Sequence, residues 1–171
     1  MIVLISGKSG SGKSRFAEQM AVTFDGPRYY IATMVPATEE NRKRIEKHRL
    51  QRQGMDFYTI EEPYKLSQTA IFSDSVVLLE DVSNFLANLM FGSKKTPQDA
   101  LAEILMLHKS CKVLLAVTIS GLSARDYAGE TASYIEGLDW LNSRLLEAAD
   151  AVVEMEDRRP VCRKGILTNE F

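Results

Sequence analysis

A run of small and charged residues near the start of the sequence has the composition of a phosphate-binding loop. It fits the pattern G-x-x-x-x-G-K-[ST] and reads Gly7-Lys8-Ser9-Gly10-Ser11-Gly12-Lys13-Ser14. Glycines let backbone N–H groups face phosphate oxygens, and the positive end of a following helix adds to the attraction. We expect Lys13 to reach the β- and γ-phosphates and the Ser14 hydroxyl to bind Mg²⁺. The predicted ligand is a nucleoside triphosphate; the alternative is a Gly-rich turn without a ligand.

A second candidate for metal binding is a pair of carboxylates at the end of an apolar run. The run Val76–Leu79 is followed directly by Glu80 and Asp81. A carboxylate at the end of such a strand can hold Mg²⁺, directly or through water. We favour Glu80 for the metal or substrate role. For Asp81 two interpretations stay open, a metal ligand or the N-cap of the helical run 82–91.

A histidine lies in a strongly basic stretch that has helical spacing. Arg44, His48 and Arg52 would share one stripe of a helix. One interpretation is a solvated basic helix with a bystander histidine. The other is a histidine that meets phosphates beside cationic side chains, where neighbouring like charges keep the imidazole neutral and nucleophilic. The second histidine, His108, has no such neighbours, and we interpret it as structural.

Apolar runs alternate with helical patterns along the whole chain. Continuously apolar runs are typical of strands covered on both faces. The expected strands are 2–6, 29–33, 76–80, 113–118 and 151–155, with weaker candidates at 57–60 and 161–167. The expected helices are 14–24, 82–91, 97–110, capped by Thr96, and 131–149. This alternation predicts an α/β fold with a mostly parallel sheet and helices on both faces. Residues 119–129 should lie at the carboxyl end of that sheet, where such sheets bind ligands.

Composition excludes several classes of protein. A chain of 171 residues with 45% apolar and 26% charged residues predicts one globular domain spanning residues 1–171. The net charge of −2 argues against nucleic-acid binding, and the basic stretch lacks the interleaved aromatic residues that such binding uses. We expect no membrane span and a cytoplasmic location. Cys111 and Cys162 are expected to be structural thiols.

Taken together, these motifs resemble those of the bifunctional adenosylcobinamide kinase / adenosylcobinamide-phosphate guanylyltransferase family of cobalamin biosynthesis. The phosphate loop is generic, but its ordered combination with an Arg-Ile-x-x-His element is specific. The resemblance covers nearly the whole chain. It rests on Arg15, Ala17-Glu18, Tyr30-Ile31-Ala32-Thr33, Arg44-Ile45 with His48, Thr59-Ile60-Glu61-Glu62-Pro63, Leu78-Leu79-Glu80, Asn88-Leu89, Asn142, Ala149-Asp150, Pro160 and Lys164.

The resemblance implies a RecA-like P-loop NTPase fold, a homotrimer and two reactions. In the first, ATP or GTP phosphorylates the aminopropanol hydroxyl of a corrinoid substrate, adenosylcobinamide. In the second, GTP guanylylates His48 and the GMP passes to the phosphorylated substrate. Lys13 and His48 would be catalytic, and Ser14 and Glu80 would hold Mg²⁺. Nucleotide binding would use the phosphate loop together with Arg44, Arg52, Glu61 and Glu80.

The sequence departs from the family pattern at two places. The family's Thr-Asn-Glu-Val-Gly element is replaced by Thr118-Ile119-Ser120-Gly121-Leu122. A proline and an aromatic residue after the histidine helix are replaced by Gln53-Gly54 and Phe57. Three functions therefore stay open: an enzyme with both activities, a kinase with one activity or a changed acceptor, and a GTP-binding regulator without chemistry.

Overall fold

The computed structural model describes residues 1–165, apart from the side chains of Arg44 and Gln51. Within these residues, seven strands form one sheet in the order β3-β2-β4-β5-β1-β6-β7. The end of the expected strand 161–167 lies outside the described residues. The strands are β1 (Ile2–Gly7), β2 (Arg28–Ala32), β3 (Phe57–Glu61), β4 (Val76–Glu80), β5 (Val113–Val117), β6 (Ala151–Glu156) and β7 (Arg159–Lys164).

Neighbouring strands are parallel except at one edge, where β7 runs antiparallel to β6. The mostly parallel sheet expected from the sequence is therefore confirmed. All residues of β4 and β5 are buried. These strands are continuously apolar because helices cover both of their faces.

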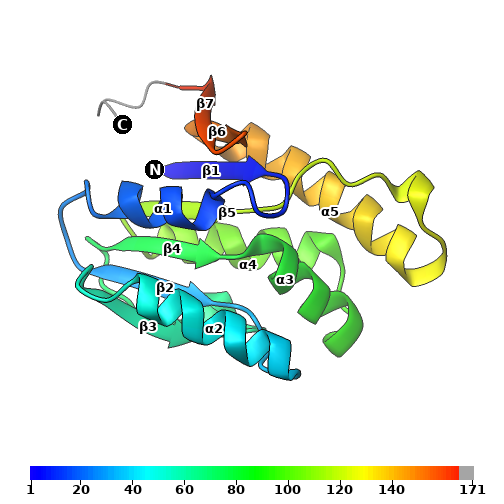
Figure 1. Ribbon diagram of the computed structural model, residues 1–171, viewed down its shortest axis with the longest axis horizontal. Helices are drawn as coiled ribbons and strands as arrows, with labels where there is room; N and C mark the ends of the chain where they lie inside the picture. The colour runs from blue at the N-terminus through cyan, green and yellow to red at the C-terminus, as the bar shows by residue number, and fades with distance from the viewer. Residues whose placement is uncertain (166–171) are drawn as a thin grey trace.

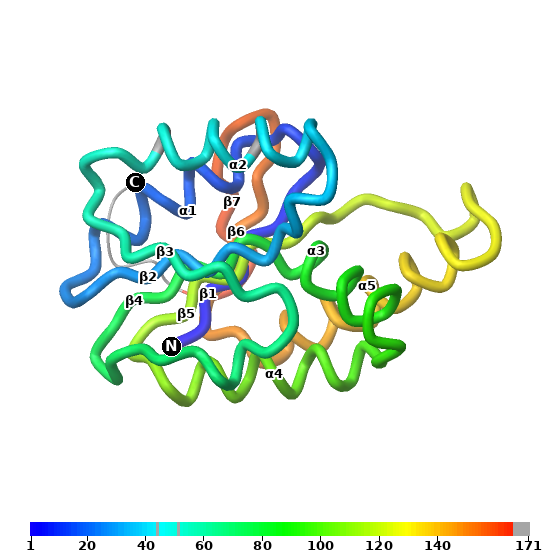
Figure 2. Tube along the Cα trace, turned by 90° about the horizontal axis from the view of Figure 1, so that it is seen from below, coloured from blue at the N-terminus to red at the C-terminus, as the bar shows by residue number. Residues whose placement is uncertain are grey.

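Helices form a layer on each side of the sheet (Figures 1 and 2). In Figure 2, α1 and α2 lie above the strands, whereas α4 and α5 lie below them. The packing of the core agrees with these two layers. Phe16 and Met20 of α1 belong to one apolar cluster, and Phe85, Ile104 and Leu141 belong to another. The helices are α1 (Lys13–Ala21), α2 (Glu39–Gln51), α3 (Val82–Ala87), α4 (Pro97–Lys109) and α5 (Gly129–Ala148). Short helical turns lie at η1 (Leu66–Gln68), η2 (Asn88–Gly92) and η3 (Ala124–Asp126).

Side-chain caps fix where several helices begin. Thr96 and Asp99 form a reciprocal capping box at α4, which also has Pro97 in its first turn. The expected helical run 82–91 is confirmed, but its hydrogen bonding changes midway, because α3 ends at Ala87 and the chain continues as a π-helical turn, η2. There the Asn88 amide donates hydrogen bonds to two carbonyl oxygens of other segments. Within the described residues, every helix is too short or too polar to cross a bilayer.

Candidate functional site

The phosphate loop joins the carboxyl end of β1 to the first turn of α1, as its mechanism requires. Gly12 precedes the helix in the left-handed region, with φ of 91°, which side chains with a Cβ rarely adopt. Gly7 leaves no room for a side chain, because a Cβ there would lie 2.9 Å from the carbonyl oxygen of Met155. The Lys13 ammonium donates to the carbonyl oxygen of Lys8 at 2.7 Å, so the lysine arches over the loop.

Two site residues from distant parts of the chain meet beside this loop. The Ser14 hydroxyl donates a hydrogen bond of 2.6 Å to Oε1 of Glu80. They meet because β1 and β4 are parallel strands of one sheet, so their carboxyl ends share an edge. Glu80 is nine-tenths buried, with 8% of its surface exposed. Hydroxyl and carboxylate oxygens are the hard ligands that Mg²⁺ binds, so the donor set fits this ion.

The structure shows a capping role for Asp81. Its Oδ1 accepts from the backbone N–H of Asn84 at 2.7 Å and from the Ser83 hydroxyl at 2.6 Å. Its Oδ2 accepts from the Asn84 amide at 3.0 Å. These contacts are those of an N-cap, which was one of the two interpretations left open for Asp81.

His48 lies in the last turn of α2, half-buried, on the side of the helix that faces the sheet. Its Nδ1 is 3.4 Å from the hydroxyl oxygen of Tyr30 in β2. The imidazole lines a cleft of about 610 Å³ together with Lys13, Ser14 and Glu80. The expected nucleophile and the phosphate loop therefore share one cavity, although α2 and α1 are separate helices.

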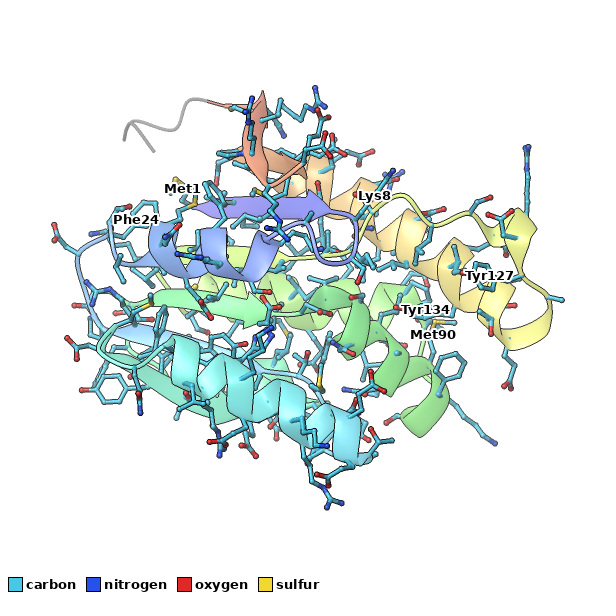
Figure 3. The ribbon with its side chains drawn as sticks, viewed as in Figure 1. Met1, Lys8, Phe24, Met90, Tyr127 and Tyr134 are labelled. Carbon is cyan, nitrogen blue, oxygen red and sulfur yellow. The ribbon has the colours of Figure 1, made fainter. Side chains whose placement is uncertain are left out.

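The far wall of the cleft comes from the other layer of helices. Ile119 and Leu122 line it from the loop after β5, and Tyr134 lines it from α5. In Figure 3 Tyr134 lies on α5 near the carboxyl end of the strands. This loop occupies the position expected for residues 119–129. Asn142 holds it, accepting from the Thr118 hydroxyl at 2.7 Å and donating to the Ile119 carbonyl at 3.0 Å.

The outer side of the phosphate loop faces a second cavity of about 620 Å³. Lys8 points along this side, and its position at the tip of the loop is visible in Figure 3. The opposite wall is the β6–β7 hairpin, which contributes Glu154 of β6 and Arg158 of the turn. The loop residues lining this cavity are Gly7, Lys8, Ser9, Gly10 and Ser11.

Of the two arginines that the helical stripe groups with His48, the structure describes the side chain of Arg52. Arg44 belongs to α2, but its side chain lies outside the described part of the chain. Arg52 is buried, with its Cζ 3.4 Å from the centroid of the Tyr30 ring and its Nη1 3.9 Å from Oε1 of Glu18. Phosphate binding by Arg52 stays a prediction. Glu61, at the end of β3, accepts a 2.6 Å hydrogen bond from exposed Arg49.

Burial perturbs two groups in this neighbourhood. Burial raises the pKa of Glu18 to about 7, and this effect outweighs the attraction of Arg52 and Arg15. Burial, followed by the negative charge of Glu80, raises the pKa of the Tyr30 hydroxyl. Tyr30 is therefore a neutral phenol at physiological pH. Sequence reasoning assigned neither Tyr30 nor Glu18 to the site. Helical spacing gives no signal for Glu18, because it lies outside the apolar stripe that Phe16 and Met20 share.

Two solved structures with folds similar to that of the chain are described as ATPases. One ATPase domain matches with a TM-score of 0.54 and 10% identity, over 96% of this chain and 76% of that one. A type III secretion ATPase of pathogenic bacteria matches with a TM-score of 0.54 and 8% identity, over 90% of this chain and 50% of that one. At such identities the likeness shows the fold alone, and it confirms the expected P-loop NTPase fold.

Sequence relatives are more specific. The bifunctional adenosylcobalamin biosynthesis protein CobP of Pseudomonas aeruginosa is 27% identical, over 95% of this chain and 96% of its own. The corresponding protein CobU of Salmonella typhimurium is 30% identical, over 89% of this chain and 93% of its own. The model of the family "Cobinamide kinase / cobinamide phosphate guanyltransferase" matches residues 3–161. The chain, with its phosphate loop and histidine in one cleft, therefore belongs to the cobinamide kinase / cobinamide phosphate guanyltransferase family.

Proposed function

We propose that this protein phosphorylates adenosylcobinamide and then transfers GMP from GTP to the phosphorylated product through His48. The observation that carries the proposal is the shared cleft, which His48, Lys13, Ser14 and Glu80 all line. Phosphoryl transfer needs a held triphosphate, and nucleotidyl transfer needs a nucleophile beside it. The two substrates are a nucleoside triphosphate and a corrinoid.

In the kinase step, the substrate hydroxyl oxygen attacks the γ-phosphorus of the triphosphate. The bond between that phosphorus and the β–γ bridging oxygen breaks, the nucleoside diphosphate leaves, and the hydroxyl proton passes to a phosphate oxygen of the products. The loop N–H groups and Lys13 orient the phosphates and offset the negative charge that develops on them. Ser14 and Glu80 would hold Mg²⁺, which neutralises phosphate charge when bound. Mg²⁺ at nucleotide sites is commonly held by one or two protein oxygen ligands together with substrate phosphates, and the pair Ser14 and Glu80 would match that donor set.

In the transfer step, a neutral imidazole nitrogen of His48 attacks the α-phosphorus of GTP. An N–P bond forms, the bond to the bridging oxygen breaks, and pyrophosphate leaves. A phosphate oxygen of the corrinoid then attacks the same phosphorus and expels the imidazole. Imidazole suits both halves because it is a good nucleophile when neutral and a good leaving group when protonated. The proposal further includes a cytoplasmic location and a homotrimeric assembly. Light scattering of the purified protein tests the assembly.

The deciding experiment exposes the protein to GTP labelled at the α-phosphorus, with Mg²⁺ and without acceptor. The wild type should retain label that is stable in alkali and lost in acid, as expected of a histidine phosphoramidate. His48→Ala should retain none. His108→Ala is the matched control and should label like the wild type, because these are the two histidines of the chain.

Undiminished labelling of His48→Ala would contradict the proposed nucleophile. Reversible GTP binding without label, together with phosphorylation of adenosylcobinamide, would identify a kinase with one activity. Binding without either product would identify a regulator.

A further inference from the structure

Helix α2 is attached to the rest of the protein in an unusual way. Among its described side chains none is buried, and only Asn41, Ile45 and His48 are even half-buried. A helix that is polar on all sides has no apolar face with which to dock. Arg52, the residue directly after the helix, is in contrast buried, with 7% of its surface exposed.

Arg52 connects three elements at this point. Its guanidinium lies against the Tyr30 ring of β2, 3.4 Å from the ring centroid, and faces Glu18 of α1 at 3.9 Å. Both side chains of the ion pair are nearly inaccessible, at 5% and 1% exposure. A buried ion pair adds little net stability compared with apolar residues of similar size. We therefore assign this ion pair a positioning role, because it fixes the end of the helix that carries His48.

Tyr30 connects this cluster to the histidine. The guanidinium lies against the face of its ring, and its hydroxyl lies 3.4 Å from Nδ1 of His48. Each neutral imidazole has one protonated and one unprotonated nitrogen, and the partner of one nitrogen decides which. A neutral phenol oxygen can accept a hydrogen bond from Nδ1–H, and that arrangement places the lone pair on Nε2.

We infer that Tyr30 and Arg52 are positioning residues, which hold His48 with Nδ1 protonated against Tyr30 so that Nε2 receives the GMP. The inference rests on the proposed function and makes it specific to one atom. In this role Arg52 acts through Tyr30 and through the end of α2. The predicted linkage is therefore an Nε2–P bond, formed as the bond to pyrophosphate breaks.

The first test compares Tyr30→Phe with Tyr58→Phe, whose hydroxyl belongs to an exposed residue of β3. Loss of the Tyr30 hydroxyl should slow single-turnover labelling of His48 by about 10- to 100-fold, as expected when a reacting group loses its alignment. The KM for GTP and the unfolding temperature should change little. Part of the remaining label should move to Nδ1, which NMR of the alkaline digest distinguishes. Tyr58→Phe should match the wild type.

The second test compares Arg52→Lys with Arg42→Gln, a change at an exposed residue of α2. Lysine keeps the charge but lacks the flat group that stacks on Tyr30. Arg52→Lys should lower the labelling rate by a similar factor without lowering the unfolding temperature, whereas Arg42→Gln should change neither the labelling rate nor the unfolding temperature. A joint loss of labelling, kinase rate and unfolding temperature would overturn the inference in favour of a purely structural role.

A third readout needs no activity. Nitrogen NMR of the nucleotide-free protein should show His48 protonated at Nδ1, and Tyr30→Phe should shift it towards the Nε2–H form. His108→Ala simplifies the assignment. Wild-type label on Nδ1, or an unchanged tautomer in Tyr30→Phe, would overturn the inference while leaving the proposed function intact. A wild type that does not label at all would instead contradict the proposed function, and the tautomer would still test the positioning.

Discussion

Ser14 and Glu80 are joined by a 2.6 Å hydrogen bond although 66 residues separate them in the sequence. The contact links the first turn of the phosphate-loop helix to the end of β4. It places a hydroxyl and a buried carboxylate together at the edge of the sheet where a nucleotide would bind. The neighbouring Asp81 has a different role, because its side chain caps the N-terminus of α3.

Glu80 should therefore matter more for turnover than Asp81. Glu80→Gln keeps the shape but removes the charge that would hold Mg²⁺, so both activities should fall by about 10- to 100-fold and need more Mg²⁺. Asp81→Asn should retain most activity, because Asn is also a good N-cap. Steady-state rates across a Mg²⁺ titration measure both variants. If Asp81→Asn lost more activity than Glu80→Gln, the carboxylates would have been assigned the wrong way round.

Lys13→Ala should remove both activities together. Its ammonium is the mobile cation at the loop, and loss of one oriented charge in such a site costs about 100- to 1,000-fold in rate. Kinase rates and labelling of His48 should fall in parallel, and circular dichroism should show an intact fold. Lys43→Ala, at an exposed position of α2, serves as the control. Full labelling of Lys13→Ala would mean that GTP reacts from some other place.

Glu18 should make the stability of the protein depend on pH. In the folded state burial raises its pKa to about 7 from the ordinary 4.5, so the folded chain keeps this proton while the unfolded chain releases it. The free energy of unfolding should then fall as the pH rises through that window, by about 1.4 kcal/mol for each pKa unit. Above the folded-state pKa the loss should be complete.

The measurement is urea unfolding of the wild type and Glu18→Gln at pH values from below the ordinary pKa of glutamate to above that of buried Glu18. Glutamine cannot ionise, so the variant should gain stability relative to the wild type as the pH rises. Glu40→Gln, an exposed change in α2, should show no such trend. A difference that is constant with pH, or that grows in the opposite direction, would contradict the raised pKa.

Asn142 should control the loop that forms the far wall of the cleft. Asn142→Ala removes its hydrogen bonds with the Thr118 hydroxyl and the Ile119 carbonyl. Because Thr118 is buried, the loss should cost about 1–3 kcal/mol of stability. Amide hydrogen exchange should accelerate in residues 119–128 more than in β5. Uniform acceleration along the chain would mean that Asn142 supports the whole fold rather than this loop.

Local signals were enough to predict the central part of the site. The pattern around Lys13 lies between an apolar strand and an amphipathic helix, and the structure has that arrangement. The meeting of Ser14 and Glu80 follows from parallel strands whose ends share an edge. The cap at Thr96 could also be predicted, because a capping residue acts within one helical turn.

The contacts of Arg52 could not be predicted in this way. The stripe that groups it with His48 does reach Arg52, the C-cap of α2, whose N–H donates to the carbonyl oxygen of His48. The direction of its side chain then depends on Tyr30 and Glu18, which belong to other elements. The early end of α3 has a similar origin, since Asn88 bonds to carbonyl oxygens of Thr33 and Pro63. Such tertiary partners leave no periodic signal in the sequence.

The order of the strands places the phosphate loop and the helix that carries His48 on different parts of the sheet. The phosphate loop follows β1, which has strands on both sides, whereas β2, α2 and β3 form a consecutive unit at one edge. Among the described strands, only the pairing of β2 with β4 joins this unit to the remainder of the sheet. Residues 28–61 are in this sense a cassette. Under the proposed function, the histidine chemistry would then lie in a segment whose sheet pairing with the rest of the molecule runs through a single pair of strands.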